Sequence, residues 1–200
     1  MNTVNISVAT PTDAADMLDI YTYYVENTAI TFEYTPPTET EFRARITQTL
    51  TKYPWLKAQI DGKTVGYAYL GTFKDRDAYL YSAETSIYIS PDARRSGVGR
   101  LLYSSLERVA KLQNILNLNA CIGCPRLDDG RLTFDSMYFH ERMGYALVGK
   151  FTYSGYKFDQ WYDMIWMEKM LGEHTSHPEA FRPFPTLTSQ ELQVIGINRT

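Results

Sequence analysis

The chain has 200 residues, a length typical of one compact domain with a sizeable hydrophobic core. Hydrophobic residues make up 44% of it and charged residues 22%, which excludes the composition of a disordered chain. Its net charge of -3 at pH 7 gives no general attraction to nucleic acid or to an anionic membrane, so we expect neither as a partner.

The N-terminal sequence has no basic segment followed by an apolar core, and no apolar run approaches the roughly 18 residues of a membrane span. We therefore expect a cytoplasmic protein. A short strand is predicted over residues 5–8, and apolar residues then recur at helical spacing through residues 14–25. Thr38 and Glu41 form a capping box that predicts the start of a second helix.

Alternating apolar residues on either side of Asp61 and Gly62 predict a β-hairpin, because this dipeptide is a strong hairpin signal. The same reasoning predicts strands over residues 79–89, 115–123, 145–151 and 161–170, and helices over residues 99–113 and 136–142. Together these elements predict a mixed α/β fold with one sheet.

From Gly172 onward the composition changes to prolines among polar residues, which predicts an extended tail on the surface or on a neighbouring subunit. We accordingly assign residues 1–171 to one domain and residues 172–200 to a C-terminal extension.

The stretch PDARRSGVGR lies between an expected strand and an expected helix. A helix N-terminus leaves about four N–H groups unpaired and carries a partial positive charge, so it can bind an anion. Gly97 and Gly99 let the backbone approach a phosphate closely, and Arg94, Arg95 and Arg100 add positive charge. The spacing alone leaves a second interpretation open, in which this stretch is a turn that binds nothing.

The spacing Arg94-x-x-Gly97-x-Gly99 resembles the pyrophosphate-binding signature of the GNAT superfamily of N-acetyltransferases. Longer blocks, among them SAETSIYISPDARRSGVGRLLY and MYFHERMGYALVGK, resemble its phosphinothricin acetyltransferase branch over most of residues 5–171. The resemblance implies the GNAT fold, with a single, mostly antiparallel sheet, flanking helices and a splayed pair of strands at the acetyl-CoA site.

The same resemblance implies the activity. It predicts an acetyl-CoA-dependent N-acetyltransferase that needs no metal and acts by direct transfer in a ternary complex. The acceptor would be the amino group of a small amino acid or an analogue such as phosphinothricin or methionine sulfoximine. A homodimer is expected as well.

Site residues follow from the resemblance too. Backbone groups would pair with the pantetheine arm or hold the pyrophosphate at Ile87, Ile89, Arg94, Arg95, Ser96, Gly97, Val98, Gly99 and Arg100. Glu84 matches the proposed general base, and His140 matches the position of the acid that protonates the leaving thiolate, with Tyr138 as a second candidate. The positions that line the acceptor pocket match Phe32, Lys74, Arg76 and Tyr79.

Other interpretations of these residues remain open from the sequence. Glu84 could be a solvated strand residue, His140 a packing residue, and Lys74 with Arg76 part of an ordinary polar loop. The enzyme could acetylate another amine, such as a polyamine or a peptide N-terminus. The chain could also be a non-catalytic module that binds acyl-CoA.

Two segments depart from the resemblance. The loop CPRLDDGRLTFDS is longer than usual in this branch and lacks an asparagine that contacts the cofactor, so the acceptor pocket can be reshaped there. The only two cysteines, Cys121 and Cys124, are expected to be reduced thiols. With His174 and His177 they could be drawn as a zinc site, but the pattern is loose and we expect no metal.

Overall fold

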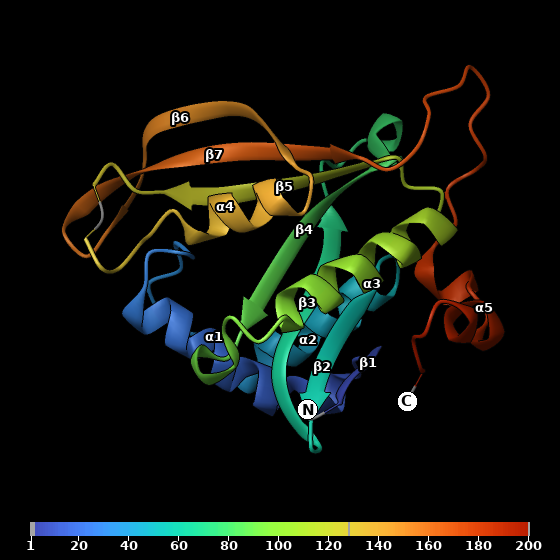
Figure 1. Cartoon of the computed structure of the whole chain (residues 1–200), viewed down its shortest axis with the longest axis horizontal. Helices are drawn as coiled ribbons and strands as arrows, with labels where there is room; N and C mark the ends of the chain where they lie inside the picture. The colour runs from blue at the N-terminus through green and yellow to red at the C-terminus, as the bar shows by residue number, and fades with distance from the viewer. Residues whose placement is uncertain (1–2, 128, 200) are drawn as a thin grey trace.

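The computed structural model describes residues 3–127 and 129–199. The strands are β1 (Val4–Val8), β2 (Trp55–Ile60), β3 (Lys63–Thr72), β4 (Ser82–Ile89), β5 (Asn117–Cys124), β6 (Ala146–Lys157) and β7 (Gln160–Met170). The helices are α1 (Ala14–Asn27), α2 (Glu39–Leu50), α3 (Val98–Leu112), α4 (Asp135–Arg142) and α5 (Ser189–Val194). Within the described residues the strands form one sheet in the order β1-β2-β3-β4-β5-β7-β6, in which only the β4–β5 pair is parallel (Figure 1). The predicted mixed α/β fold with a mostly antiparallel sheet is confirmed.

The start of α2 shows how the sequence determines a helix end. The Thr38 hydroxyl accepts a hydrogen bond from the Glu41 N–H (3.3 Å), and the Glu41 carboxylate accepts one from the Thr38 N–H (2.7 Å). Both groups thereby satisfy backbone donors that the helix leaves unpaired. Phe42 and Ile46, one turn apart, then face the core, so the predicted capping box is confirmed.

Helices cover both faces of the sheet. On one face α1 and α2 pack against β2 and β3 through an aromatic cluster that includes Tyr21, Tyr24, Phe42, Trp55 and Tyr67. On the other face α3 packs mainly against β3 and β2, and α4 packs against β5 (Figure 1). We call these the α1 face and the α3 face. Over the described part of the chain, each helix is too short or too polar to cross a membrane.

The strands β4 and β5 separate along their length. They pair only over residues 82–84 and 117–119, at the start of each strand. Beyond these residues β4 continues along β3 while β5 continues along β7, so the two strands diverge (Figure 1). The predicted splayed pair is therefore β4 and β5.

The hairpin β6–β7 lies at the free edge of the sheet. Its first strand has 12 residues, more than the sequence pattern predicted. Two non-glycine residues, Phe158 and Asp159, make the turn with φ of +52° and +59°, so the glycine that normally marks a hairpin is missing. A bulge in β6 opposite Asp163 also interrupts the alternation of apolar residues.

The C-terminal segment folds back onto the domain. Phe184, Leu187, Leu192 and Ile197 are buried in the main core, and the Val8 N–H donates to the carbonyl of Asn198 (2.9 Å) beside β1. The expectation of an extended surface tail therefore fits residues 172–180, which are exposed and outside any helix or strand, and is wrong for the part from Phe184 to Ile197. Apolar residues spaced among the prolines bury enough surface to hold the segment against the core.

Candidate active site

The loop before α3 presents backbone N–H groups at a helix start. Gly97 is the N-cap of α3 and has a φ of +87°, a left-handed conformation that glycine adopts without strain. No acidic residue lies in the first turn of α3, so nothing there offsets its partial positive charge. Glycine suits position 99 for a different reason, because a Cβ there would lie 3.3 Å from the ring of Phe139. Gly97 therefore shapes the loop, and Gly99 lets α4 pack closely against it.

Two other loop residues hold the loop in place. The Ser96 hydroxyl donates a hydrogen bond to the carbonyl of Ala93, and the Val98 side chain is buried in the main core. The Val98 side chain points into the protein, so any contact that Val98 makes with a ligand comes from its backbone, whereas Ser96 is exposed.

A groove of about 380 Å³ runs from this loop along the end of β4 toward α4. Four arginines line it, Arg94, Arg95, Arg100 and Arg142, against the single carboxylate of Asp135. The groove therefore carries local positive charge on a chain that is acidic overall, which suits a pyrophosphate.

Tyr24 joins the arginine loop to β4. Its ring centroid lies 5.3 Å from the guanidinium carbon of Arg94. Its hydroxyl donates to the Ile89 carbonyl (2.6 Å) and accepts from the Ile89 N–H (3.3 Å). These are the backbone groups that we expected to pair with pantetheine, so an arm bound there has to share or displace the Tyr24 hydroxyl. Ile87 lines both the groove and the pocket at its inner end.

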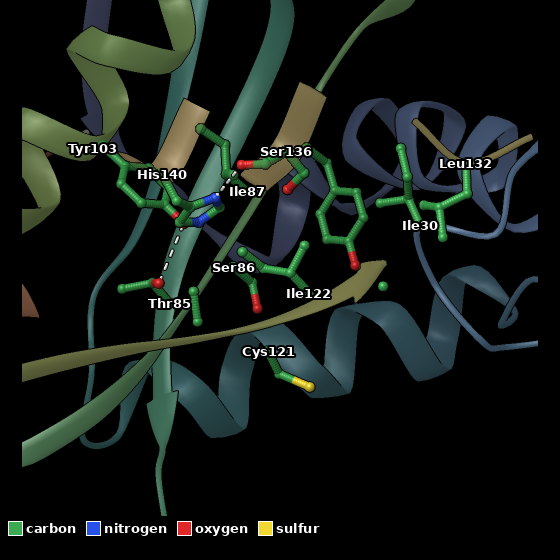
Figure 2. Close-up of a pocket in the computed structure, with 13 residues that line it drawn as sticks. Ile30, Thr85, Ser86, Ile87, Tyr103, Cys121, Ile122, Leu132, Ser136 and His140 are labelled. Atoms are coloured by element: carbon green, nitrogen blue, oxygen red, sulfur yellow. Dashed lines mark hydrogen bonds between the residues drawn. The ribbon is translucent and has the colours of Figure 1, made fainter. Parts of the chain in front are cut away.

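That inner pocket lies in the opening between β4 and β5 (Figure 2). Thr85 and Ser86 come from β4, Cys121 and Ile122 from β5, and His140 from α4. Because strand residues alternate between faces, Thr85 and Ile122 lie on the α3 face, and Ser86 and Cys121 on the α1 face. The pocket therefore connects the groove on one side of the sheet with the space on the other side.

Glu84 lies where β4 and β5 begin to separate, paired with Gly71 of β3 and Asn119 of β5. The alternation of β4 places its side chain on the α1 face, across the sheet from the arginine groove. Burial raises the pKa of the Glu84 carboxyl, and the nearby ammonium of Lys74 opposes this shift. A carboxylate in this position can take a proton from an ammonium group.

His140 is buried beside the same pocket. Its Nδ1 lies 2.7 Å from the carbonyl of Ser136, which can only accept, so Nδ1 carries the proton. Its Nε2 therefore accepts from the Tyr103 hydroxyl at 2.7 Å. Burial lowers the pKa of His140 to about 4, although the bond to Ser136 opposes the shift. The imidazole is therefore neutral at pH 7.

The expected acceptor residues fall into separate places. The Lys74 ammonium lies over the rings of Phe73 (5.1 Å) and Trp166 (5.5 Å), and Tyr79 packs edge-on against Phe73. Arg76 is exposed in the same loop. These residues place a cation and aromatic rings near Glu84 on the α1 face.

Phe32 lies elsewhere on that face, at the hairpin. Its ring is 6.2 Å from that of Tyr162, and it covers the bare backbone of Gly155, where an added Cβ would clash with it. Lys74 therefore lies near Trp166, and Phe32 lies near Tyr162. These two aromatic residues of β7 are four positions apart in the sequence.

Comparison with known proteins decides the family. The sequence model of the acetyltransferase (GNAT) domain matches residues 6–166, which include both the arginine loop and Glu84. The chain is a GNAT acetyltransferase. It transfers an acetyl group from acetyl-CoA to an amine, and the arginine groove with the N-terminus of α3 fits the pyrophosphate of that substrate.

Individual relatives agree with this assignment. The chain is 32% identical to a phosphinothricin N-acetyltransferase of Streptomyces viridochromogenes, over 90% of this chain and 94% of the relative. It is 34% identical to another of that name from Alcaligenes faecalis, over 87% of this chain and 86% of the relative. The crystal structure of a GNAT superfamily phosphinothricin acetyltransferase from Sinorhizobium meliloti with acetyl-CoA superimposes with a TM-score of 0.82 and 33% identity, covering 91% of this chain and 97% of the other.

Sequence reasoning missed several residues of this acetyltransferase site, among them Tyr103, Trp166 and Leu132. Tyr103 and Trp166 lay inside an expected helix and an expected strand with no role assigned, and Leu132 lies in the loop between β5 and α4. The pairing of Cys121 with Trp166 across β5 and β7 could have identified Trp166, had the strand order been known. Nothing in the local sequence marks Tyr103 or Leu132.

The zinc arrangement drawn from the sequence does not form. Cys121 is exposed and Cys124 is buried on the opposite face of β5, and both are free thiols. His174 instead places Nε2 2.6 Å from the side-chain oxygen of Asn117. In residues 3–127 and 129–199 no group of three or more histidine, cysteine, aspartate or glutamate side chains could hold a metal ion.

Proposed function

We propose that this acetyltransferase acetylates the α-amino group of a small amino acid or amino-acid analogue, by direct transfer while both substrates are bound. One observation carries the proposal: the arginine groove and the Glu84 carboxylate lie on opposite faces of the sheet and meet at the opening between β4 and β5. Donor and acceptor can therefore approach each other from the two faces.

Direct transfer is favoured over an acyl-enzyme. The thiol in the inner pocket belongs to Cys121; the residue as a whole is exposed, but partial desolvation of the thiol raises its pKa to about 11. At neutral pH it is protonated and a poor nucleophile. In the proposed reaction Glu84 takes the proton of the acceptor ammonium, and the free amine attacks the thioester carbonyl. The tetrahedral intermediate then expels the CoA thiolate.

The proton for that thiolate was expected from His140. A neutral imidazole with a filled Nδ1 bond has no proton to give from Nε2, and transfer of the Tyr103 proton to Nε2 is unfavourable because burial raises the pKa of Tyr103 and lowers that of His140. We therefore keep His140 in the proposal only as one member of a pair with Tyr103.

The charge near Glu84 distinguishes between acceptors. The Lys74 ammonium is close enough to Glu84 to oppose the rise of its pKa that burial causes. A cation in this position also attracts the carboxylate of an amino acid. It repels a polyamine. The names of the relatives, phosphinothricin N-acetyltransferases, agree with an amino-acid acceptor.

We also propose a homodimer. Strand β6 is the edge of the sheet, and among its large apolar side chains Leu147, Val148, Phe151 and Tyr153 are each more than half exposed. An edge strand with this surface is suited to cover by a second copy of the chain.

The test is CoA release from acetyl-CoA with phosphinothricin, methionine sulfoximine, methionine sulfone, common amino acids and spermidine as acceptors. Turnover on the amino acids or their analogues, lost in Glu84→Gln and kept in Glu26→Gln on the exposed end of α1, supports the proposal. Turnover on spermidine alone contradicts it, and tight acetyl-CoA binding without turnover on any acceptor favours a non-catalytic module.

A further inference from the structure

We propose that Leu132, in the inserted loop between β5 and α4, sets the length of the amino-acid side chain that the site accepts. The inference rests on the proposed function. It assigns a specificity role to a residue of the loop that we expected, from the sequence, to be longer than usual in this branch.

Leu132 lies inside the protein although its loop is on the surface. Its side chain is 1% exposed and packs with Ala29 and Tyr162. A Cβ added to Gly123 of β5 would lie 3.4 Å from Leu132 Cδ2 and 3.0 Å from the Ala29 carbonyl oxygen. Leu132 therefore covers bare backbone of β5, on the same face of that strand as Cys121.

This position is one end of the inner pocket. Figure 2 shows Leu132 and Ile30 on the side of the pocket opposite Tyr103 and His140. Both are aliphatic, so this end of the pocket is apolar. A ligand that extends past Cys121 in this direction meets Leu132.

Hydrogen bonds hold the Leu132 wall in place. The Asp129 carboxylate accepts from the N–H groups of Arg131 (2.9 Å) and Leu132 (3.0 Å) and from the Tyr162 hydroxyl (2.6 Å). The Arg131 carbonyl accepts from the Ala29 N–H (3.0 Å). Burial would raise the pKa of Asp129, but these hydrogen bonds outweigh it and lower that pKa. The loop is thus tied both to β7 and to the segment after α1.

The polar groups on the α1 face fix how an amino acid lies. Its amine has to reach Glu84, and its carboxylate is attracted to Lys74, which packs on Trp166. Its side chain then points along β5 toward Leu132. In a closed apolar pocket a single methylene group changes kcat/KM roughly 10- to 200-fold, so the position of Leu132 decides the longest side chain that fits.

A homologous series of acceptors measures the depth of this pocket. We would determine kcat/KM at saturating acetyl-CoA for alanine, 2-aminobutyrate, norvaline, norleucine and phenylalanine. Leu132→Ala is expected to move the optimum toward longer side chains. The ratio of kcat/KM for the longest acceptor to that for the shortest should change by about tenfold or more. Leu132→Met, which keeps the volume, is expected to keep the wild-type profile.

Two further variants sharpen the test. Leu127→Ala removes a leucine of the same loop that is 83% exposed, and is expected to change nothing. Gly123→Ala adds a methyl group against Leu132 and is expected to move the optimum toward shorter side chains. The double variant Gly123→Ala with Leu132→Ala should partly restore the wild-type optimum.

Three outcomes would overturn the inference. One is a folded Leu132→Ala variant, with a normal thermal transition, whose acceptor ratios equal those of the wild type. Another is a variant that gains longer acyl-CoA donors while its acceptor profile stays fixed, because Leu132 would then bound the acyl group. If Leu132→Ala does not fold, the same acceptor ratios are measured on Leu132→Val, and ratios equal to those of the wild type overturn the inference. A wild type that acetylates spermidine and no amino acid removes the proposed function itself, and the inference with it.

Discussion

The hydroxyl of Tyr103 on α3 lies 2.7 Å from Nε2 of His140 on α4, at the inner end of the pocket between β4 and β5. The hydrogen bond joins two helices that meet at the α3 face of the site. Both groups are buried, and burial raises the pKa of Tyr103 well above its ordinary value while it lowers that of His140 to about 4. The pair is therefore neutral across the physiological pH range.

His140 makes the fold sensitive to acid. Its pKa in the folded state, about 4, is below the ordinary value of 6.5, so the unfolded chain binds more protons between these two pH values. Stability therefore falls as the pH decreases from 6.5 to 4, by about 3 kcal/mol from this residue. Urea unfolding at pH 7 and pH 4 is expected to show this loss in the wild type and a smaller loss in His140→Gln. Equal pH dependence in both proteins would contradict the neutral, buried state of His140.

Tyr103→Phe separates a catalytic role of the pair from a structural one. If the Tyr103 hydroxyl protonates the thiolate while His140 holds that hydroxyl in place, both Tyr103→Phe and His140→Gln are expected to lower kcat by about 10²-fold, with an unchanged KM for acetyl-CoA. The measurement is steady-state kinetics from pH 6 to pH 9. Lower thermal stability with an unchanged kcat in both variants would leave the pair a packing role only.

Lys74→Met is expected to act on Glu84. Burial raises the pKa of Glu84 and the Lys74 ammonium opposes the rise, so removal of Lys74 raises that pKa further. The base has to be deprotonated, so kcat/KM increases as the pH rises through the Glu84 pKa. This rising, acidic limb of the pH profile should move to higher pH in Lys74→Met. The acceptor KM should rise as well. Lys63→Met, exposed at the start of β3, serves as the control, and a limb that stays in place in Lys74→Met would exclude the coupling.

Gly97→Ala tests the pyrophosphate loop against a matched turn. Gly97 and Gly62 both have positive φ, +87° and +80°, and a Cβ would have open space at each. Alanine at either position therefore carries a similar backbone strain, of the order of 1 kcal/mol. The KM for acetyl-CoA is expected to rise severalfold in Gly97→Ala and to stay unchanged in Gly62→Ala. Equal KM values in the two variants would show that the loop geometry does not matter for binding.

Leu192→Ala tests the C-terminal segment. Leu192 of α5 is fully buried in the main core, so the truncation is expected to cost about 2–5 kcal/mol of unfolding free energy. Val194→Ala on the same helix, 81% exposed, is expected to cost less than about 0.5 kcal/mol. Denaturant unfolding compares the two, and equal midpoints would mean that the tail adds nothing to the fold.

Phe151→Lys tests the dimer. Phe151 is 56% exposed on the edge strand β6, and a charge there opposes burial against a second copy of the chain. Light scattering at micromolar concentration is expected to give a dimer for the wild type and a smaller mass for the variant. A monomeric wild type would remove the proposal.

The sequence was sufficient for most of the local structure. Capping residues such as Thr38 and the Asp61-Gly62 turn act on neighbours a few residues away, so their effect is visible in the pattern itself. The arginine loop could be located for the same reason, because its geometry depends on Gly97 and on the helix that follows. Where a turn uses ordinary residues, as at Phe158 and Asp159, the pattern gave no signal and β6 was predicted too short.

The sequence by itself thus determined the family, the arginine loop and the position of Glu84, because each is recorded in contiguous residues. The tertiary structure alone decided which distant residues share a surface. Pairing of β5 with β7 brings Cys121 beside Trp166, and the loop between β5 and α4 crosses to the α1 face to place Leu132 against Gly123. It also decided that His140 is neutral and that the tail is buried, since desolvation depends on everything that packs around a group and not on its neighbours in the chain.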